Sequence, residues 1–281
     1  MSLHGKTIFI SGASRGIGLA IALRAARDGA NVALVAKTAE PHPRLEGTVY
    51  TAAEQIEAAG GKALPIVGDI RDEAQVEAAV AQAVARFDGI DVCVNNASAI
   101  NLAGTEALDM KRYDLMQDIN VRGTFAVSRA CIPHLREAAN PHILTLSPPI
   151  DLHPRWLGPH LGYTLAKYGM SIVALGLAAE LREDGIASNA LWPRTLVATA
   201  AVQNLLGGDA AMARARRPEI YADAAYAILN RPARACTGNA FLCEDVLREE
   251  GVADLSPYSY VEGAELAVDL FVDAADPPPL G

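Results

Sequence analysis

Short apolar, β-branched runs alternate with stretches of apolar residues at helical spacing along most of the chain. Continuous apolar runs of about four to eight residues are typical of strands buried on both faces. Six such strands are predicted, at Lys6–Ile10, Asn31–Ala36, Ala63–Val67, Ile90–Val94, His142–Leu146 and Ala187–Leu191. Helices are predicted between them, at Ile17–Asp28, Thr51–Ala59, Asp72–Phe87, Ala107–Ala138 and Tyr163–Leu181. This alternation predicts an α/β fold, a doubly wound parallel sheet with helices on both faces.

No linker or shift in composition divides the chain, so we predict a single domain over residues 1–272 and a flexible proline-rich tail at 273–281. Two segments interrupt the alternation. Thr38–Gly47 lengthens the loop after the second strand, and Thr195–Arg217, broken by Gly207-Gly208, follows the sixth strand. Insertions at the carboxyl ends of parallel strands build the binding sites of doubly wound folds. We therefore expect the site at this edge of the sheet.

Composition and charge exclude several classes of function. The 281 residues are 51 % hydrophobic and 20 % charged, as in an average soluble globular protein. The net charge of −9 repels phosphate backbones, so neither nucleic acid nor an anionic membrane is an expected partner. Four cysteines without C-x-x-C spacing suit a reducing compartment, and no histidine spacing indicates a metal. With no signal peptide and no apolar run long enough for a membrane span, we predict a cytoplasmic protein.

A glycine-rich turn joins the first strand to its helix, with the sequence Ser11-Gly12-Ala13-Ser14-Arg15-Gly16-Ile17-Gly18. Glycines let the backbone approach a pyrophosphate, and the following helix offers free N–H donors and the positive end of its dipole. The turn from Gly12 to Gly18 is therefore a candidate dinucleotide site, and a plain tight turn is the alternative.

The ends of the next two strands bear on the choice of cofactor. NAD-binding proteins usually place an acidic residue where this chain has Lys37. Together with Arg15, Lys37 favours a 2′-phosphate and hence NADP(H), unless it is only a solvated strand end. Asp72 suits the N-cap of the following helix, which leaves Asp69 free to bind the adenine amino group.

Tyr163 and Lys167 stand four residues apart, which places both on one face of a predicted helix. A phenol with a pKa of about 10 is a poor acid or base at neutral pH. A nearby ammonium, helped by a cationic nicotinamide ring, would favour the phenolate and bring that pKa toward the working range. The spacing alone is common, but its position after the fifth strand makes the two residues a candidate catalytic pair.

Taken in order, the glycine turn, Asp69, Asn95-Asn96-Ala97, Asn120 and the Tyr163/Lys167 pair resemble the short-chain dehydrogenase/reductase family over nearly the whole chain. Further segments narrow the resemblance to one group within the family, namely residues 36–39 (AKTA), 41–43 (PHP), 147–149 (SPP), 166–170 (AKYGM) and 190–193 (ALWP). The resemblance implies a Rossmann-like fold with seven strands, a nicotinamide cofactor, and hydride transfer at a carbinol or carbonyl carbon.

The resemblance also implies roles for individual residues. Tyr163 would be the acid–base residue, Lys167 would hold the nicotinamide ribose and lower the pKa of Tyr163, and Asn120 would anchor a water in a proton relay. Further cofactor contacts would come from Asp69, Ile70, Asn96, Ala97, Pro193 and Thr195. The asparagines after the fourth strand can alternatively bond only the loop backbone. The helix from Tyr163 is too apolar for a single buried face, which with the family's pairing of helices predicts a homodimer or homotetramer.

Two positions depart from the family pattern. Ile150 stands where the family usually has its catalytic serine, and Ser147 is the hydroxyl that we expect to take its place, on the nicotinamide side. The family's Pro-Gly after the sixth strand reads Pro193-Arg194. Arg194 either reaches a cofactor phosphate or an acidic substrate, or is a solvated loop charge.

Apolar residues in two loops predict a pocket for a small hydrophobic substrate, a carbonyl or alcohol of acyl or steroid-like character. They are Ile150, Leu152, Trp156, Leu157, Leu161, Leu196, Val197, Val202, Leu205 and Leu206. Arg214, Arg216 and Arg217 either meet an anionic head group or form a charged helix face. A non-catalytic NADP(H)-binding redox sensor is the alternative function; the irregular serine favours it, whereas Tyr163 and Lys167 favour an enzyme.

Overall fold

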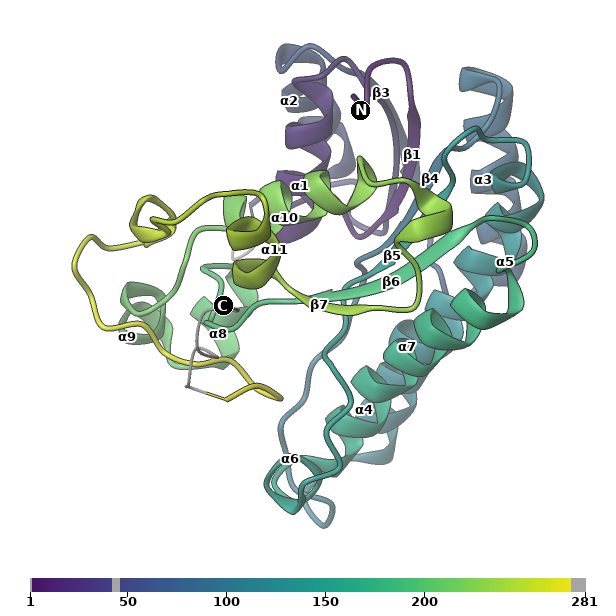
Figure 1. Ribbon diagram of the computed structural model, residues 1–281. Helices are drawn as coiled ribbons and strands as arrows, with labels where there is room; N and C mark the ends of the chain where they lie inside the picture. Colours follow the sequence, from purple (N-terminus) through teal and green to yellow (C-terminus); the bar gives the residue numbers. More distant parts are fainter. Residues whose placement is uncertain (1, 42–45, 274–281) are drawn as a thin grey trace.

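Seven parallel strands form one sheet in the order β3-β2-β1-β4-β5-β6-β7 (Figure 1). The computed structural model describes residues 2–41 and 46–273, so the predicted tail beyond Asp273 and most of the 41–43 motif lie outside it. The strands are β1 Thr7–Ser11, β2 Asn31–Ala36, β3 Lys62–Val67, β4 Val92–Asn95, β5 His142–Thr145, β6 Ala187–Trp192 and β7 Ala240–Leu242. The predicted Rossmann-like fold is confirmed, and β7 supplies the seventh strand.

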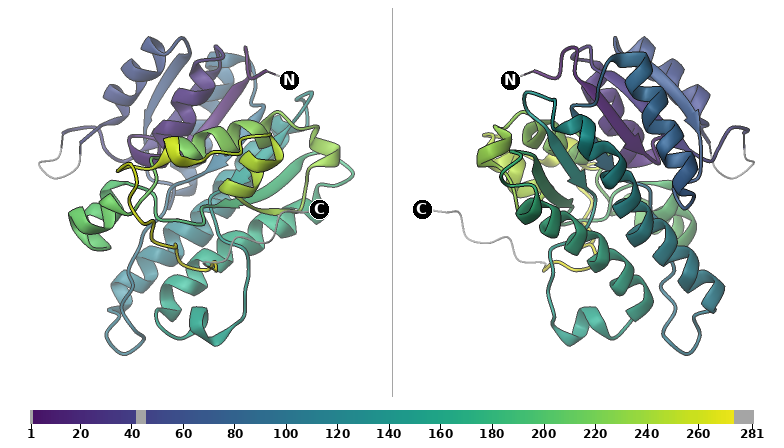
Figure 2. Two further views of the ribbon diagram at one scale, coloured as in Figure 1. Left: turned by 60° about the vertical axis from the view of Figure 1, so that its left-hand side comes forward. Right: turned by 90° about the vertical axis from the view of Figure 1, so that its right-hand side faces the viewer.

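Helices cover both faces of the sheet (Figure 2). One face is covered by α1 Gly16–Ala26, α2 Val49–Ala58, α10 Glu219–Leu229 and α11 Cys243–Glu249. The other is covered by α3 Glu73–Phe87, α5 Thr124–Leu135 and α7 Leu161–Glu180. Ile8 and Leu34 belong to the first hydrophobic core, while their neighbours Phe9 and Ala33 belong to the second. Successive side chains of a strand point to opposite faces, so each strand serves both cores.

The helix predicted over Ala107–Ala138 is shorter and has three parts: α4 Met110–Met116, a π-helical segment Gln117–Gly123, and α5. It begins at Met110 because the Asp109 side chain accepts the N–H of Lys111 and caps the helix. A π-helical segment widens the helix locally, so an apolar periodicity that continues on both sides does not reveal it. Such segments are rare and occur frequently at functional sites.

Several short helices were not predicted. They are α6 Pro154–Leu157, α8 Ala200–Leu205 and α9 Gly208–Ala213, together with α10 and α11 of the first face. Helices α8 and α9 lie in the insertion after β6, and the break between them falls at Gly207, whose φ is +124°. A residue with a side chain rarely adopts that angle, so the glycine permits the turn.

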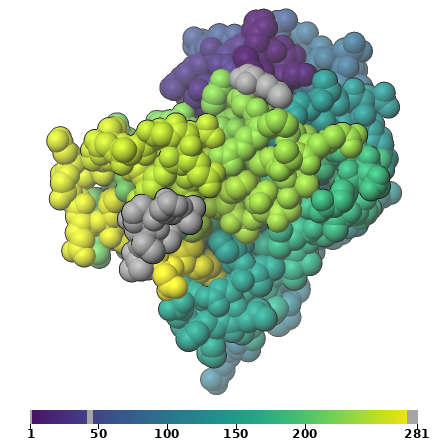
Figure 3. Space-filling model, viewed as in Figure 1, coloured from purple at the N-terminus to yellow at the C-terminus, as the bar shows by residue number. Residues whose placement is uncertain are grey.

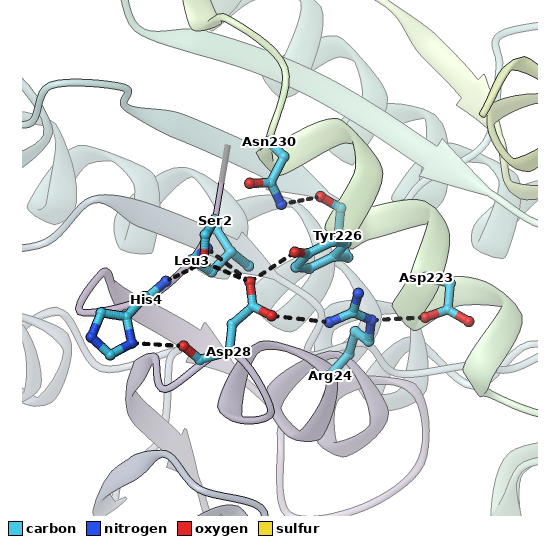
Figure 4. Close-up of polar contacts among 8 residues, drawn as sticks. All are labelled: Ser2, Leu3, His4, Arg24, Asp28, Asp223, Tyr226 and Asn230. Atoms are coloured by element: carbon cyan, nitrogen blue, oxygen red, sulfur yellow. Dashed lines mark hydrogen bonds and ion pairs between the residues drawn. The ribbon is translucent and has the colours of Figure 1, made fainter.

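Asp28 fixes the N-terminal residues to α1 and α10 (Figure 4). Its carboxylate accepts hydrogen bonds from the Ser2 hydroxyl, the Leu3 N–H and the Tyr226 hydroxyl. Arg24 lies 3.4 Å from the centroid of the Tyr226 ring. Asp28 follows the C-terminal end of α1, so this network lies at the edge of the sheet opposite the carboxyl ends of the strands. Its contribution is therefore to stability and not to the candidate site.

Helix α7 is the one helix among the described residues that is long and apolar enough to cross a membrane. Its 18-residue window has a mean hydropathy of 1.2, and 61 % of that window is buried inside the fold. Burial of this extent is typical of a core helix packed against a sheet.

Candidate active site

The strand order reverses between β1 and β4, and ligands of doubly wound folds bind at the carboxyl ends of strands at such a point. The glycine turn follows β1, and Asn96 and Ala97 follow β4. Gly12 has a φ of +74°, and a Cβ there would lie 2.8 Å from the Ala97 Cα. The Asn96 Nδ2 donates to the carbonyls of Ser11 and Gly12, both at 2.9 Å. Asn96 therefore holds the glycine turn in place through the loop backbone.

The N-terminus of α1 fits a pyrophosphate. Arg15 at the N-cap makes no side-chain bond to the N–H groups of the first turn, so these donors remain available to a ligand. Gly16 has a φ of +61°, and a Cβ there would contact only the Thr199 methyl group, at 3.7 Å. The turn therefore leaves room for an anionic group directly at the positive end of the helix dipole.

Arg15 and Lys37, the two cations predicted to favour NADP(H), both interact with neighbouring protein groups. Arg15 donates to the carbonyls of Glu46 at 2.8 Å and Gly47 at 2.6 Å. Lys37 Nζ lies 3.1 Å from the Asp69 carboxylate, and 59 % of the Lys37 side chain is exposed. The Lys37 ammonium thus lies at the rim of the site, as part of an ion pair and not as an isolated charge.

Asp72 caps α3 as predicted, because its carboxylate accepts the N–H groups of Ala74 and Gln75. The expectation that this leaves Asp69 free is wrong. Arg71 donates to Asp69 through Nε at 3.0 Å and Nη2 at 2.6 Å, and Lys37 adds an ion pair. Hydrogen bonds from Arg71, and secondly the charge of Lys37, hold the pKa of Asp69 well below its usual range, although burial acts to raise it. An adenine amino group would share this carboxylate with two cations.

Tyr163 and Lys167 are buried on the same face of α7. Lys167 Nζ donates to the Leu146 carbonyl at the end of β5, at 2.7 Å, and lies 5.0 Å from the centroid of the Trp192 ring. Both side chains line a cavity of about 180 Å³ together with Ile17, Asn96 and Pro193. The cavity thus joins the catalytic pair to the glycine turn and to the ends of β4 and β6.

Burial changes the pKa values of the acid–base groups that line the cavity. Burial, and secondly the charge of Asp269, raise the pKa of Tyr163, while burial lowers the pKa of Lys167 to about 7. The pKa of Asp269 is itself raised to about 7, chiefly by burial. Lys167 alone therefore does not produce the predicted lowering for Tyr163. Additional positive charge, such as an oxidised nicotinamide ring, is needed to favour the phenolate.

The Ser147 hydroxyl is fully buried and has no hydrogen-bond partner among the described residues. Buried polar atoms of this kind are rare, so the hydroxyl retains the capacity to bond a ligand or water. The Asn120 side chain is committed, because its Oδ1 accepts the Ala99 N–H at 2.7 Å and its Nδ2 donates to the Ala99 carbonyl at 3.0 Å. These two bonds fix the orientation of the Asn120 side chain, and a relay water would bind to the remaining capacity of its amide or to the backbone of the π-helical segment.

Other predicted contacts point away from the cavity. The Thr195 hydroxyl donates to buried Glu244, and Ile70 packs near Gly123. Arg194 pairs with Asp245 at 2.7 Å, and its side chain is only 13 % exposed. The interpretation of Arg194 as a solvated loop charge is therefore wrong. The side chain of Arg214 pairs with Glu265, and that of Arg216 pairs with Glu244. The side chain of Arg217 donates to the Pro257 carbonyl. These arginines therefore tie the insertion after β6 to the C-terminal residues.

The predicted apolar lining is correct in part. Leu196, Val197, Val202 and Leu206 line the cavity, and Trp156 and Leu157 pack onto the hydrophobic cluster around Tyr163. Ile150, Leu152, Leu161 and Leu205 are exposed. The loop after β5 turns outward before α6, and composition alone does not distinguish its inward from its outward side chains.

Sequence reasoning missed several cavity residues, among them Trp192, Thr199, Tyr221, Asp269 and Leu270. Thr199 begins α8 beside Gly16, four residues beyond the predicted Thr195. The irregular Pro193-Arg194 segment and the insertion obscured which threonine faces the cavity. Asp269 and Leu270 lie far along the chain from every recognised motif, and no local pattern marks them.

Comparisons with known proteins agree with this geometry. The family model described as "short chain dehydrogenase" matches residues 6–208. Hydroxysteroid dehydrogenase-like protein 2 of Danio rerio and of Homo sapiens are 57 % and 52 % identical to the chain over 96 % of its length. The chain spans 65 % and 64 % of those two proteins.

Two solved structures are similar as well. A short-chain dehydrogenase of Mycobacterium thermoresistibile is 68 % identical, with a TM-score of 0.94 and 99 % of each chain covered. A putative dehydrogenase from Xanthomonas campestris is 57 % identical, with a TM-score of 0.94, covering 97 % of this chain and 100 % of the other. The strand order, the glycine turn, the Tyr163/Lys167 pair and these matches agree: the chain belongs to the short-chain dehydrogenase/reductase family.

Proposed function

We propose that the chain is an NADP(H)-dependent oxidoreductase that transfers a hydride between the nicotinamide and a hydrophobic carbonyl or alcohol, in a cytoplasmic setting. The observation that carries this proposal is the single cavity onto which Tyr163, Lys167 and the glycine turn converge. Its remaining lining is largely apolar, which suits an apolar substrate. A redox sensor needs the cofactor site but has no use for a buried tyrosine and lysine beside it.

The cofactor would be held by residues from several elements. The turn from Gly12 to Gly18 would bind the pyrophosphate, and Asp69 with Ile70 would border the adenine. Asn96, Ala97 and Pro193 would border the nicotinamide half, and Lys167 would bond its ribose. We assign the contact expected of Thr195 to Thr199, because Thr199 lines the cavity and lies beside Gly16. When bound, the cofactor supplies or accepts the hydride.

The chain's own residues would manage the proton and the developing charge. Tyr163 would give a proton to the substrate oxygen during reduction and remove it during oxidation. Ser147 would donate a hydrogen bond to the same oxygen and stabilise negative charge there. Lys167 would hold positive charge next to Tyr163, and Asn120 would hold a water that returns the proton to solvent.

Lys37 is expected to set the cofactor preference. A single charge-assisted contact to the 2′-phosphate contributes about 1.5–3 kcal/mol, so NADPH should bind about 10- to 100-fold more tightly than NADH. Lys37→Asp should narrow or invert this ratio. Fluorescence titration of each cofactor measures it, and Lys62→Asp, the same charge change at the amino end of β3, is the control. Equal dissociation constants in the parent protein would refute the assignment.

We also propose that the chain forms a homodimer or homotetramer. Two adjacent helices expose large apolar side chains. Phe125 of α5 is 54 % exposed, and on α7 Leu165 is 49 % and Ile172 61 % exposed. A two-fold axis would bury them against their copies. Light scattering at micromolar concentration should report twice or four times the monomer mass, and Ile172→Asp should lower it. A monomeric parent protein would contradict the proposal.

A further inference from the structure

The residues Ala264–Asp273, here called the C-terminal strap, run beside the catalytic cavity. Figure 1 shows this yellow segment returning past α9 toward the side of α6, and Figure 3 shows it on the surface. The Asp269 N–H donates to the Arg194 carbonyl, and the Leu196 N–H donates to the Ala267 carbonyl, both at 2.9 Å. The Trp192 Nε1 donates to the Leu270 carbonyl at 2.9 Å. The strap is thus bonded to the end of β6 and the loop that follows it.

Phe271 of the strap occupies the centre of an aromatic cluster around Tyr163. The Phe271 side chain is 2 % exposed, and its φ of +70° is rare for a bulky residue. Strained backbone of this kind persists only where the surroundings hold it, and it gathers at functional sites. Its ring centroid lies 5.2–6.1 Å from those of Trp156, His160, Tyr163, Tyr168 and Trp192.

Asp269, two residues earlier, brings a carboxylate into the cavity wall with Tyr163 and Lys167. Its Oδ1 accepts the N–H of Leu270 at 2.7 Å, so the side chain is anchored within the strap. Its negative charge acts on Tyr163 and Lys167, and Glu244 lies close enough to act on Asp269 in turn. The pKa of Asp269 is about 7, so above that pH its ionised form would place like charge beside an anionic group at the reacting carbon, in a partly dehydrated site.

We propose that the C-terminal strap selects the substrate. Phe271, which does not itself line the cavity but packs against the ring of Tyr163, limits the size of the group beside the reacting carbon, and Asp269 in the cavity wall excludes anionic groups there. The inference rests on the proposed function and narrows it. The cavity of about 180 Å³ is small beside the roughly 300–1,000 Å³ usual for ligand pockets, and the substrate would share it with the nicotinamide. The substrate class is an uncharged carbonyl or alcohol with a slim group at the reacting carbon, such as an acyl-type chain. We therefore expect a steroid-like ring system to be a poor substrate.

The size limit is tested with two neutral ketones, butanone and the bulky acetylnaphthalene, in NADPH-dependent reduction. The parent protein should favour butanone, and Phe271→Ala should raise the specificity constant for the bulky ketone relative to butanone by about 10-fold or more. Phe271→Leu, which keeps more of the packing, should change the ratio in the same direction and guards against a folding defect. Phe241→Ala, which removes a ring outside the cluster, should leave the ratio unchanged. An unchanged ratio in both Phe271 variants overturns the size limit.

The charge limit is tested with levulinate and methyl levulinate, which carry the same ketone and differ in charge. The parent protein should favour the ester. Asp269→Asn should raise the specificity constant for levulinate relative to the ester by about 10-fold or more. Asp273→Asn, in the same strap but exposed and paired with Arg155, should leave the ratio unchanged. A parent protein that prefers levulinate, or an Asp269→Asn variant with an unchanged ratio, overturns the charge limit.

These outcomes separate the inference from the proposed function. If the parent protein turns over these ketones and the ratios do not respond, the strap does not select the substrate and the oxidoreductase proposal stands. If the parent protein and all variants turn over none of the four ketones while binding NADPH, the proposed function fails, and the inference fails with it.

Discussion

Tyr163→Phe is expected to lower turnover by about 100-fold or more while leaving the affinity for NADPH almost intact. The phenol acts chiefly in the transition state, by moving a proton at the substrate oxygen, and loss of a general acid has effects of this size. Burial and Asp269 raise the pKa of Tyr163, so the hydroxyl is held protonated and ready to donate. Steady-state kinetics and cofactor titration measure the two quantities separately.

Tyr168→Phe provides a matched control on the same helix. The Tyr168 hydroxyl donates to the Asp151 carbonyl at 2.7 Å and does not line the catalytic cavity, so its loss should leave turnover nearly unchanged. Lys167→Ala should damage both turnover and cofactor binding, because one ammonium serves both. Full activity of Tyr163→Phe on a confirmed substrate would show that the acid–base assignment is wrong.

Ser147→Ala is expected to lower turnover by about two orders of magnitude with little change in thermal stability. Removal of one preorganised donor to a developing oxyanion costs about 2.7–4 kcal/mol. The Ser147 hydroxyl has no partner among the described residues, so its removal breaks no bond that stabilises the fold. Pro148 and Pro149 follow it and fix the backbone, which would hold the hydroxyl in one position.

Ser171→Ala is the control for Ser147→Ala, because it removes a buried hydroxyl that has a structural hydrogen bond and no expected role in catalysis. The Ser171 Oγ donates to the Pro148 carbonyl at 2.6 Å, so this variant should lose about 1 kcal/mol of stability while turnover stays within a few-fold of the parent. Thermal unfolding and kinetics on both serine variants are the measurements. Unchanged turnover of Ser147→Ala would assign the donor role to a water or to another polar group.

The sheet was predictable because burial on both faces leaves continuous apolar runs such as 31–36 and 142–146. The glycine turn and the Tyr163/Lys167 pair were predictable because each is local in sequence, with its chemistry set by close spacing. The same local reasoning identified Asp72 as a helix cap. These features depend on neighbours within a few residues of each other.

The features of the site that the sequence did not predict depend on contacts between residues far apart along the chain. The Lys37–Asp69 ion pair joins the ends of two strands, so neither charge could be recognised as engaged from its own segment. Thr199 replaces Thr195 at the cavity because of how the insertion folds over Gly16. Phe271 and Asp269 reach the site through the path of the C-terminal strap, which no periodicity or motif specifies.

The most direct test of the account follows the hydride itself. NADPH carrying two deuterium atoms at nicotinamide C4 is incubated with the purified chain and methyl levulinate or butanone, and the product alcohol is examined by mass spectrometry and NMR. The account predicts one deuterium at the carbinol carbon, with transfer reduced about 100-fold or more in Tyr163→Phe. Intact NADPH binding with no deuterium in either product would contradict it and would favour the redox-sensor alternative.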